Sequence, residues 1–150
     1  MYATFAEEGK LWKQGYRFVA CIDEAGRGPL AGPVVAAAVC LNLVKESLTK
    51  LRITRLRDSK QLSSKRREEI YEKIKQHPAI QWGIGIFSEK VIDKINIFQA
   101  TRLAMRKAVL GLEKKLKTAN LPKNLHNTNL RYSKAMYYVD FLIVDGNMVL

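Results

Sequence analysis

The feature that most constrains the fold of this chain is a Gly- and Pro-rich segment, residues 21–33, set between two apolar runs. Residues 16–22 and 34–43, on either side of it, are rich in β-forming and small apolar residues. This pattern predicts two adjacent strands joined by a loop. Because loops held by a rigid sheet often carry binding and catalytic residues, we expect function here.

Two neighbouring carboxylates, Asp23 and Glu24, lie at the start of this segment. Burying such charges is costly unless a cation or hydrogen-bond donors meet them, and hard cations such as Mg²⁺ and Mn²⁺ prefer oxygen ligands. Gly26, Arg27 and Gly28 suit a phosphate, since glycine opens the backbone to close approach and arginine supplies a planar cation. The same residues also fit a solvated turn, and no Walker-type Gly-Lys-Ser or Gly-Lys-Thr follows.

The charge balance of the 150 residues is strongly basic. Lys and Arg number 26 against 14 Asp and Glu, a formal net charge of +12. This favours an anionic partner, nucleic acid first and an anionic membrane or the ribosome second. No apolar run is long enough to span a membrane, and Glu7 and Glu8 lie where a signal peptide would be basic, so we expect a cytoplasmic protein. Cys21 and Cys40 lie in apolar runs and are expected to be buried free thiols.

Three segments have helical patterns. Apolar residues at three- and four-residue steps predict a helix at residues 95–116. Residues 65–75 predict another, which Ser63 or Ser64 can cap. A weaker amphipathic pattern predicts a short helix within residues 1–15.

Residues 80–87 predict a third strand, in which Gly83 and Gly85 indicate close packing of a helix. The polar residues 118–133 predict a surface loop or insertion. The chain thus contains both predicted strands and predicted helices, and we expect an α/β fold in one domain over residues 1–150.

The last apolar run, residues 137–144, ends directly before Asp145, while Asp140 near its start is expected at the surface. A carboxylate after a buried parallel strand lies where α/β folds place ligands. If the first and last strands are neighbours, Asp145 can meet Asp23 and Glu24, and such a cluster suits two-metal phosphoryl chemistry. Adjacent strand residues point to opposite faces, so Asp23 and Glu24 can share a metal only if the strand ends or twists between them.

Three motifs resemble the ribonuclease HII family, the bacterial type 2 ribonucleases H. The longest is Ile-Asp-Glu-Ala-Gly-Arg-Gly-Pro-Leu-Ala-Gly-Pro-Val-Val-Ala-Ala-Ala-Val at residues 22–39. Residues 58–63, Asp-Ser-Lys-Gln-Leu-Ser, are similar to an Asp-Ser-Lys-Lys-Leu-Ser element that holds the substrate backbone, with Gln61 replacing the second lysine. Residues 141–147, Phe-Leu-Ile-Val-Asp-Gly-Asn, resemble the surroundings of a metal-binding aspartate.

The resemblance implies that Asp23, Glu24 and Asp145 are catalytic and bind Mn²⁺ or Mg²⁺. It implies that six residues bind substrate: Gly26, Arg27, Gly28, Asp58, Ser59 and Lys60. The first three would contact the 2′-hydroxyl of a ribonucleotide, which distinguishes RNA from DNA, and the neighbouring backbone.

The family hydrolyses the RNA strand of RNA–DNA hybrids and cuts on the 5′ side of single ribonucleotides in duplex DNA, giving a 3′-hydroxyl and a 5′-phosphate. The resemblance therefore implies an endonuclease with these nucleic acids as partners and no membrane partner. It also implies a ribonuclease H-like fold, a mixed β-sheet flanked by helices.

The chain departs from the family after residue 145, since it stops at Leu150. The family continues through a fourth metal-binding aspartate and a tyrosine that stacks at the RNA–DNA junction. We therefore expect a domain that lacks the family's C-terminal strand and helices, exposes apolar surface and can self-associate through the incomplete sheet. The alternatives are a basic nucleic-acid-binding protein without hydrolysis, an inactive fragment, and a basic protein of the ribosome or nucleoid.

Overall fold

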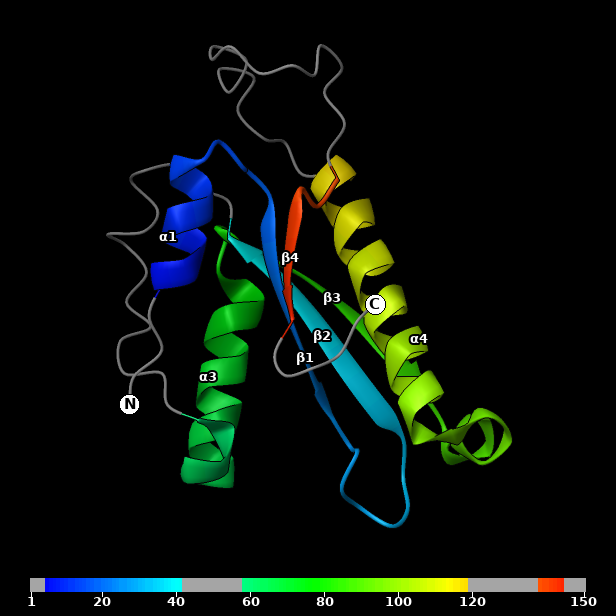
Figure 1. Ribbon diagram of the computed structural model, residues 1–150. Coiled ribbons are helices and arrows are strands. Elements are labelled where there is room, and N and C mark those ends of the chain that lie inside the picture. The colour runs from blue at the N-terminus through cyan, green and yellow to red at the C-terminus, as the bar shows by residue number, and fades with distance from the viewer. Residues whose placement is uncertain (1–4, 42–57, 119–137, 145–150) are drawn as a thin grey trace.

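The computed structural model describes residues 5–41, 58–118 and 138–144 (Figure 1). In chain order its elements are α1 (Ala6–Lys13), β1 (Val19–Ala25), β2 (Val34–Leu41), η1 (Ser59–Gln61), α3 (Ser64–Gln76), β3 (Ile80–Phe87), α4 (Glu89–Thr118) and β4 (Phe141–Val144). Each predicted helix and strand is present, and the bounds of β3 agree with the predicted residues 80–87.

The described strands form one mixed sheet in the order β3-β2-β1-β4. β2 pairs antiparallel with both β1 and β3, whereas β4 pairs parallel with β1. Figure 1 shows α4 along one face of this sheet and α1 and α3 on the other side. This confirms the expected α/β class with a mixed sheet flanked by helices, and the first and last strands are neighbours.

Two glycines of β3 allow α4 to lie directly on the sheet. A Cβ atom at Gly83 would collide with the backbone oxygen of Ala108, and one at Gly85 with the backbone oxygen of Ala104. No side chain fits at either place, which confirms that these glycines serve close packing of a helix.

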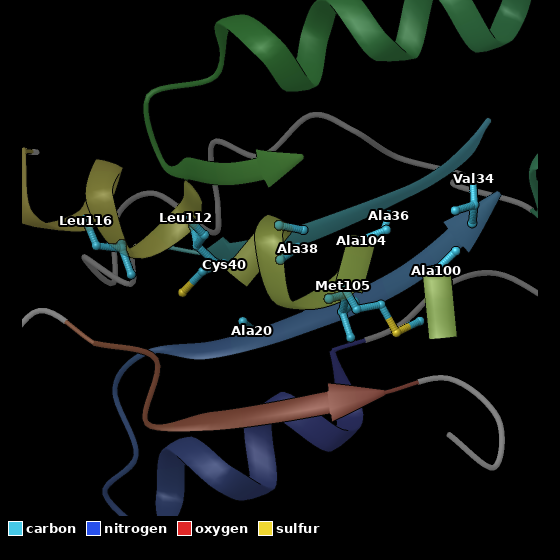
Figure 2. Close-up of a cluster of buried hydrophobic side chains, with 12 residues drawn as sticks. Ala20, Val34, Ala36, Ala38, Cys40, Ala100, Ala104, Met105, Leu112 and Leu116 are labelled. Carbon is cyan, nitrogen blue, oxygen red and sulfur yellow. The ribbon is translucent and has the colours of Figure 1, made fainter. Parts of the chain in front are cut away.

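The hydrophobic core lies between α4 and the face of the sheet formed by β1 and β2 (Figure 2). Small side chains on the strands, such as Ala36 and Ala38, meet small and larger ones on the helix, such as Ala104 and Met105, all with no exposed surface. The apolar spacing that predicts the helix at residues 95–116 includes Leu103, but this residue is 39% exposed and lies outside the core.

Helix α4 begins earlier than the predicted Ile95. It starts at Glu89 and has a break at Asn96, where φ is 69° and ψ is 164°. The Asn96 side-chain oxygen accepts a hydrogen bond from the backbone N–H of Gln99 at 3.0 Å. Asn96 therefore caps the longer second segment of the helix, as short polar side chains commonly do at a helix start.

The other face of the sheet is less covered in the described part of the chain. Ile84 and Ile86 of β3 are 40% and 49% exposed, and Val35, Ala37 and Val39 of β2 are only partly buried. This agrees with the expected exposure of apolar surface. No helix in the described ranges is both long and apolar enough to cross a membrane. Residues 119–133 of the predicted loop lie outside the described residues.

Candidate active site

Strand β1 carries both Asp23 and Glu24 within it. The expectation that this strand ends at residue 22 is wrong, since β1 continues to Ala25, with Asp23 opposite Ala37 and Glu24 opposite Ala36 of β2. The antiparallel ladder with β2 extends the strand beyond the apolar run. Alternation therefore holds through both carboxylates, which leave β1 on opposite faces.

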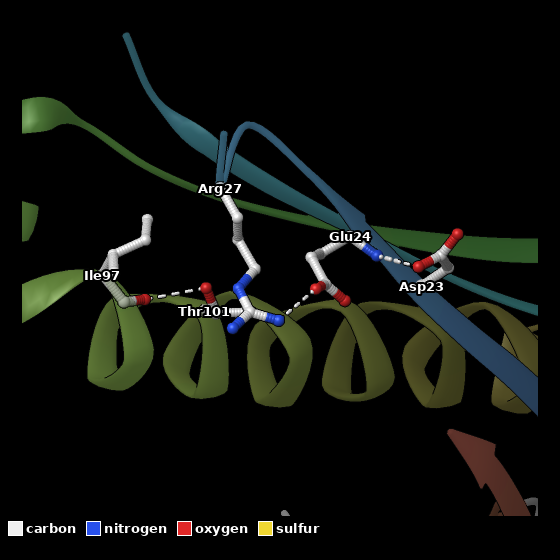
Figure 3. A network of polar contacts seen from close by, with 5 residues as sticks. All are labelled: Asp23, Glu24, Arg27, Ile97 and Thr101. Carbon is white, nitrogen blue, oxygen red and sulfur yellow. Dashed lines mark hydrogen bonds and ion pairs between the residues drawn. The ribbon is translucent and has the colours of Figure 1, made fainter. Parts of the chain in front are cut away.

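The two carboxylates consequently have different surroundings. Glu24 shares its face with the buried Ile22, toward α4, and its side chain is only 14% exposed. Asp23 is exposed, and its Oδ1 accepts a hydrogen bond from the backbone N–H of Glu24 at 2.7 Å (Figure 3). The two acids are thus neighbours at the end of β1, but their side chains lie on opposite faces of the sheet.

Glu24 is paired with Arg27. The guanidinium Nη1 of Arg27 donates to Glu24 Oε1 at 2.8 Å, from the loop that follows β1 (Figure 3). The predicted phosphate-binding cation therefore contacts a predicted metal ligand. This pairing offsets part of the cost of keeping the Glu24 carboxylate largely shielded from water.

The glycines on either side of Arg27 have different roles. Gly26 has φ +94°, and a Cβ there would collide with the backbone oxygen of Pro33, so the closing of the β1–β2 loop requires glycine at this position. Gly28 has open space around its Cα. The fold therefore requires glycine at residue 26 but not at residue 28.

Strand β4 is held beside β1 by Asp140. Its Oδ2 accepts hydrogen bonds from the backbone N–H groups of Arg17 and Phe18, both at 2.9 Å, and its own N–H donates to Phe18 O at 2.9 Å. Asp140 is exposed, as expected, and it also joins the starts of the two strands. In the parallel register that follows, Ile22 lies opposite Val144. Asp145, the third predicted metal ligand, lies outside the described residues.

The predicted backbone-binding residues Asp58, Ser59 and Lys60 lie in the turn that contains η1. Asp58 Oδ1 accepts from the backbone N–H of Lys60 at 2.9 Å, and Asp58 O accepts from the N–H of Gln61 at 2.9 Å. Ser63, one of the two predicted caps, then caps α3 by accepting from the N–H of Arg66 at 3.3 Å. These residues form a compact turn at the start of α3.

Six predicted substrate residues thus lie in two segments, the loop after β1 and the turn before α3. In the parts of the chain that the structure describes, no hydrogen bond or ion pair joins the two segments. Each segment is ordered by its own contacts.

Sequence reasoning missed Arg67, which donates from α3 to the carbonyls of this turn, and the bonds that Asp140 makes. A signal for Arg67 was present. The first turn of α3 holds three consecutive cations and no acid, although a helix N-terminus favours negative charge, so one of those cations needs a local partner.

Neither cysteine is a thiolate at neutral pH. Burial raises the pKa of Cys21 to about 12, and the hydrogen bond from its Sγ to Glu8 Oε1 at 3.1 Å adds to this. Burial also raises the pKa of Cys40 to about 12. Both are free thiols, as predicted, although Cys21 is only partly buried. A raised pKa makes a thiol a weak nucleophile.

The donors at the end of β1 fit a hard divalent cation, because carboxylate oxygens are its preferred ligands. Asp23 and Glu24 are two such groups. Among residues 5–41, 58–118 and 138–144, no three His, Cys, Asp or Glu side chains are grouped closely enough to hold a metal ion.

Comparison with known proteins places these features in a family. The family model described as Ribonuclease HII matches residues 20–136, well over half of the chain. Ribonuclease HII of Alkaliphilus metalliredigens is 53% identical over 105 residues, which are 70% of this chain and 48% of that protein. Ribonuclease HII of Listeria monocytogenes serotype 4a is 50% identical over 106 residues, 71% of this chain and 38% of that protein.

The alignment with ribonuclease HII of Alkaliphilus oremlandii covers 75% of this chain and 52% of that protein, at 48% identity. The chain thus spans about half the length, or less, of these curated relatives. The matched residues 20–136 include β1, the loop after it and the turn before α3. This chain belongs to the ribonuclease HII family.

Proposed function

We propose that this chain carries the catalytic region of an endoribonuclease that hydrolyses the RNA strand of RNA–DNA hybrids and cuts 5′ of single ribonucleotides in duplex DNA. The observation that carries the proposal is the parallel pairing of β1 with β4, in which Ile22 lies opposite Val144. The residues that follow these two in the sequence are Asp23 and Asp145. Two acids after paired positions of parallel strands are the arrangement a shared metal site needs.

In this proposal Asp23, Glu24 and Asp145 hold Mn²⁺ or Mg²⁺. Because Asp23 and Glu24 leave β1 on opposite faces, the strand would have to twist between them for both to reach one ion. Divalent cations in such a cluster supply the charge that activates water and stabilises the leaving oxygen. The contribution of this chain is to hold the carboxylates: the β1–β2 ladder fixes Asp23 and Glu24, and the bonds of Asp140 fix β4 beside them. No side-chain nucleophile is required, which is consistent with the high pKa of both cysteines.

Substrate recognition is assigned to the two ordered segments. Gly26, Arg27 and Gly28 would meet the ribonucleotide, with Gly28 open to a close backbone contact and Arg27 supplying the cation. Hydrogen bonding to the 2′-hydroxyl by such a loop would distinguish a ribonucleotide from a deoxyribonucleotide.

The turn at residues 58–60 would hold the phosphate backbone through Ser59 and Lys60, while Asp58 orders the turn itself. The net charge of +12 supports this assignment, because neutralising phosphates supplies most of the sequence-independent affinity for nucleic acid.

The test is cleavage of an RNA–DNA hybrid labelled on the RNA strand, with Mn²⁺, with Mg²⁺ and with a chelator. We expect cleavage of the RNA strand alone, only with metal, and its loss in Asp23→Asn. Glu72→Gln is the matched control, because it neutralises an exposed carboxylate of α3 that is paired only within its helix, with Lys75 and Gln76. A folded chain that binds the hybrid but leaves it intact under every condition would favour the alternative, a nucleic-acid-binding protein without hydrolysis.

A further inference from the structure

The turn before α3 is tied to that helix by one side chain, Arg67. Its Nη1 donates to the carbonyl oxygens of Ser59 at 3.2 Å and Leu62 at 2.7 Å. Its Nη2 donates to Ser64 Oγ at 3.1 Å. One guanidinium therefore joins the first residue of η1, the residue that follows η1 and the first residue of α3.

These bonds use the shape of the guanidinium. Arginine presents its donors in a rigid planar fork, whereas lysine concentrates its three donors at one point. The acceptors of Arg67 come from three residues and meet both Nη atoms, so an ammonium group could not satisfy them together. A cation here also suits the carbonyl end of a helical turn.

Without these hydrogen bonds, a positive charge at the position of Arg67 would be electrostatically unfavourable. Arg67 is the fourth residue of α3, next to Lys65 and Arg66, at a helix end that disfavours cations. Arg66 instead donates along its own helix to Glu69 Oε2 at 2.8 Å and does not contact the turn. Both arginines are exposed, but the side chain of Arg67 bonds the turn before α3, whereas that of Arg66 bonds within α3.

We infer that Arg67 is a positioning residue that fixes the turn of residues 58–62 for contact with the nucleic-acid backbone through Ser59 and Lys60. This inference rests on the proposed backbone-binding role of that turn. Asp58 restrains the turn through the N–H of Lys60. Arg67 restrains it on both sides of Lys60, through the carbonyls of Ser59 and Leu62. The backbone conformation at Lys60 is therefore fixed by these bonds, and so is the direction in which its side chain starts from the turn.

The test is binding of a labelled RNA–DNA hybrid without divalent cations, so that no cleavage can occur, measured by fluorescence anisotropy. Arg67→Lys keeps the charge and removes the fork. We expect it to raise the Kd about three- to tenfold, as loss of one or two net hydrogen bonds would. Arg66→Lys, the matched control, is expected to bind as the unaltered chain does. Hydrogen exchange of the Gln61 and Leu62 amides is expected to speed up in Arg67→Lys only, because both amides bond within the turn.

A double-mutant cycle with Lys60→Ala separates positioning from direct contact. If Arg67 acts through the turn, Arg67→Lys weakens binding in the unaltered chain and adds little once Lys60→Ala is present. If the two losses add in full, or Arg67→Lys binds normally, the inference is overturned while the role of Lys60 stands. If Lys60→Ala alone leaves the Kd unchanged, the proposed backbone contact itself fails.

Thermal melts of each variant show that the binding losses come from folded protein. Ser64→Ala is the second variant, since it removes the Nη2 acceptor and keeps Arg67. We expect it to raise the Kd in the same direction, about twofold, consistent with loss of a single exposed hydrogen bond. Unaltered binding by Ser64→Ala together with unaltered binding by Arg67→Lys would contradict the inference.

Discussion

Glu24 Oε1 and Arg27 Nη1 lie 2.8 Å apart, so the less exposed of the two described carboxylates of the candidate site forms an ion pair with the cation of the adjacent loop. The Glu24 side chain is 14% exposed and that of Arg27 is 45% exposed. A divalent cation and Arg27 would therefore compete for the same oxygen. For Glu24 to hold the metal and Arg27 to meet the substrate, as proposed, Arg27 would have to leave Glu24.

This competition predicts that Arg27→Gln binds Mn²⁺ more tightly than the unaltered chain, up to about fivefold, the size expected for a partly exposed ion pair. The same variant is expected to bind the RNA–DNA hybrid more weakly, because Arg27 no longer meets the substrate. Free Mn²⁺ measured by electron paramagnetic resonance during a titration gives the first quantity.

Arg66→Gln is the control for that titration, since Arg66 has a similar pairing with Glu69 at 2.8 Å three residues along its helix. It is expected to leave Mn²⁺ affinity unchanged. Equal or weaker Mn²⁺ binding by Arg27→Gln would show that Arg27 does not compete for Glu24.

Gly85→Ala is expected to destabilise the fold by about 1–3 kcal/mol, the usual cost of overpacking. The added Cβ would meet the backbone of Ala104, which cannot move without displacing α4. Gly111→Ala is the contrasting change, because a Cβ there lies 3.7 Å from Gly83 Cα, an ordinary contact. In the helix interior it should be neutral or stabilising by up to about 1 kcal/mol. Urea unfolding of both variants decides this, and equal stability would contradict the close packing.

Asp140→Ala is expected to cost about 1–2 kcal/mol of folding free energy, because two backbone N–H groups lose their charged acceptor. Asp140→Asn keeps an acceptor oxygen and should cost less. Asp93→Ala removes another exposed carboxylate, on α4, and should change stability by less than about 0.5 kcal/mol. Chemical unfolding measures all three, and a loss in Asp140→Ala no larger than in Asp93→Ala would mean that Asp140 does not hold β4.

The buried thiols predict a loss of stability in alkali. The pKa of Cys40 is raised from its ordinary value near 9 to about 12, so the folded protein keeps a proton that the unfolded chain releases. Its contribution is complete below about pH 9 and is lost as the pH rises from there toward about 12, by at most about 1.4 kcal/mol per pH unit.

Cys40→Ala should therefore lose less stability than the unaltered chain between about pH 8 and about pH 11, and urea midpoints along this range measure the difference. Parallel pH profiles for the two proteins would show that the Cys40 thiol does not titrate differently in the folded state.

Much of the fold follows from local patterns. The alternating apolar residues of 80–87 were sufficient to predict β3. Gly83 and Gly85 were sufficient to predict that a helix packs closely on this strand. The end of β1 was not predictable from its apolar run, because pairing with β2 extends the strand through polar residues as far as Ala25. The break at Asn96 depends on a side-chain bond to Gln99 that no periodicity shows.

For the candidate site, the sequence motif named residues but did not show how their side chains are arranged. Asp23 and Glu24 were identified from a motif, whereas their opposite faces and the engagement of Glu24 by Arg27 depend on tertiary contacts. Arg67 and Asp140 escaped prediction for the same reason. The acceptors and donors they meet are mainly backbone groups, which every residue possesses, so the run of cations at the start of α3 could indicate that one of them needs a partner but not which carbonyls it contacts.

The most direct test of the account is cleavage of a DNA duplex that contains one ribonucleotide, compared with the same duplex made entirely of DNA. With Mn²⁺ or Mg²⁺ the account predicts a single cut on the 5′ side of the ribonucleotide, with a 3′-hydroxyl and a 5′-phosphate, and none in the all-DNA duplex. Asp23→Asn and Asp145→Asn should abolish the cut, and Glu72→Gln should retain it. A folded chain that binds the duplex without cutting it, or an Asp23→Asn variant that cuts as fast as the unaltered chain, would contradict the account.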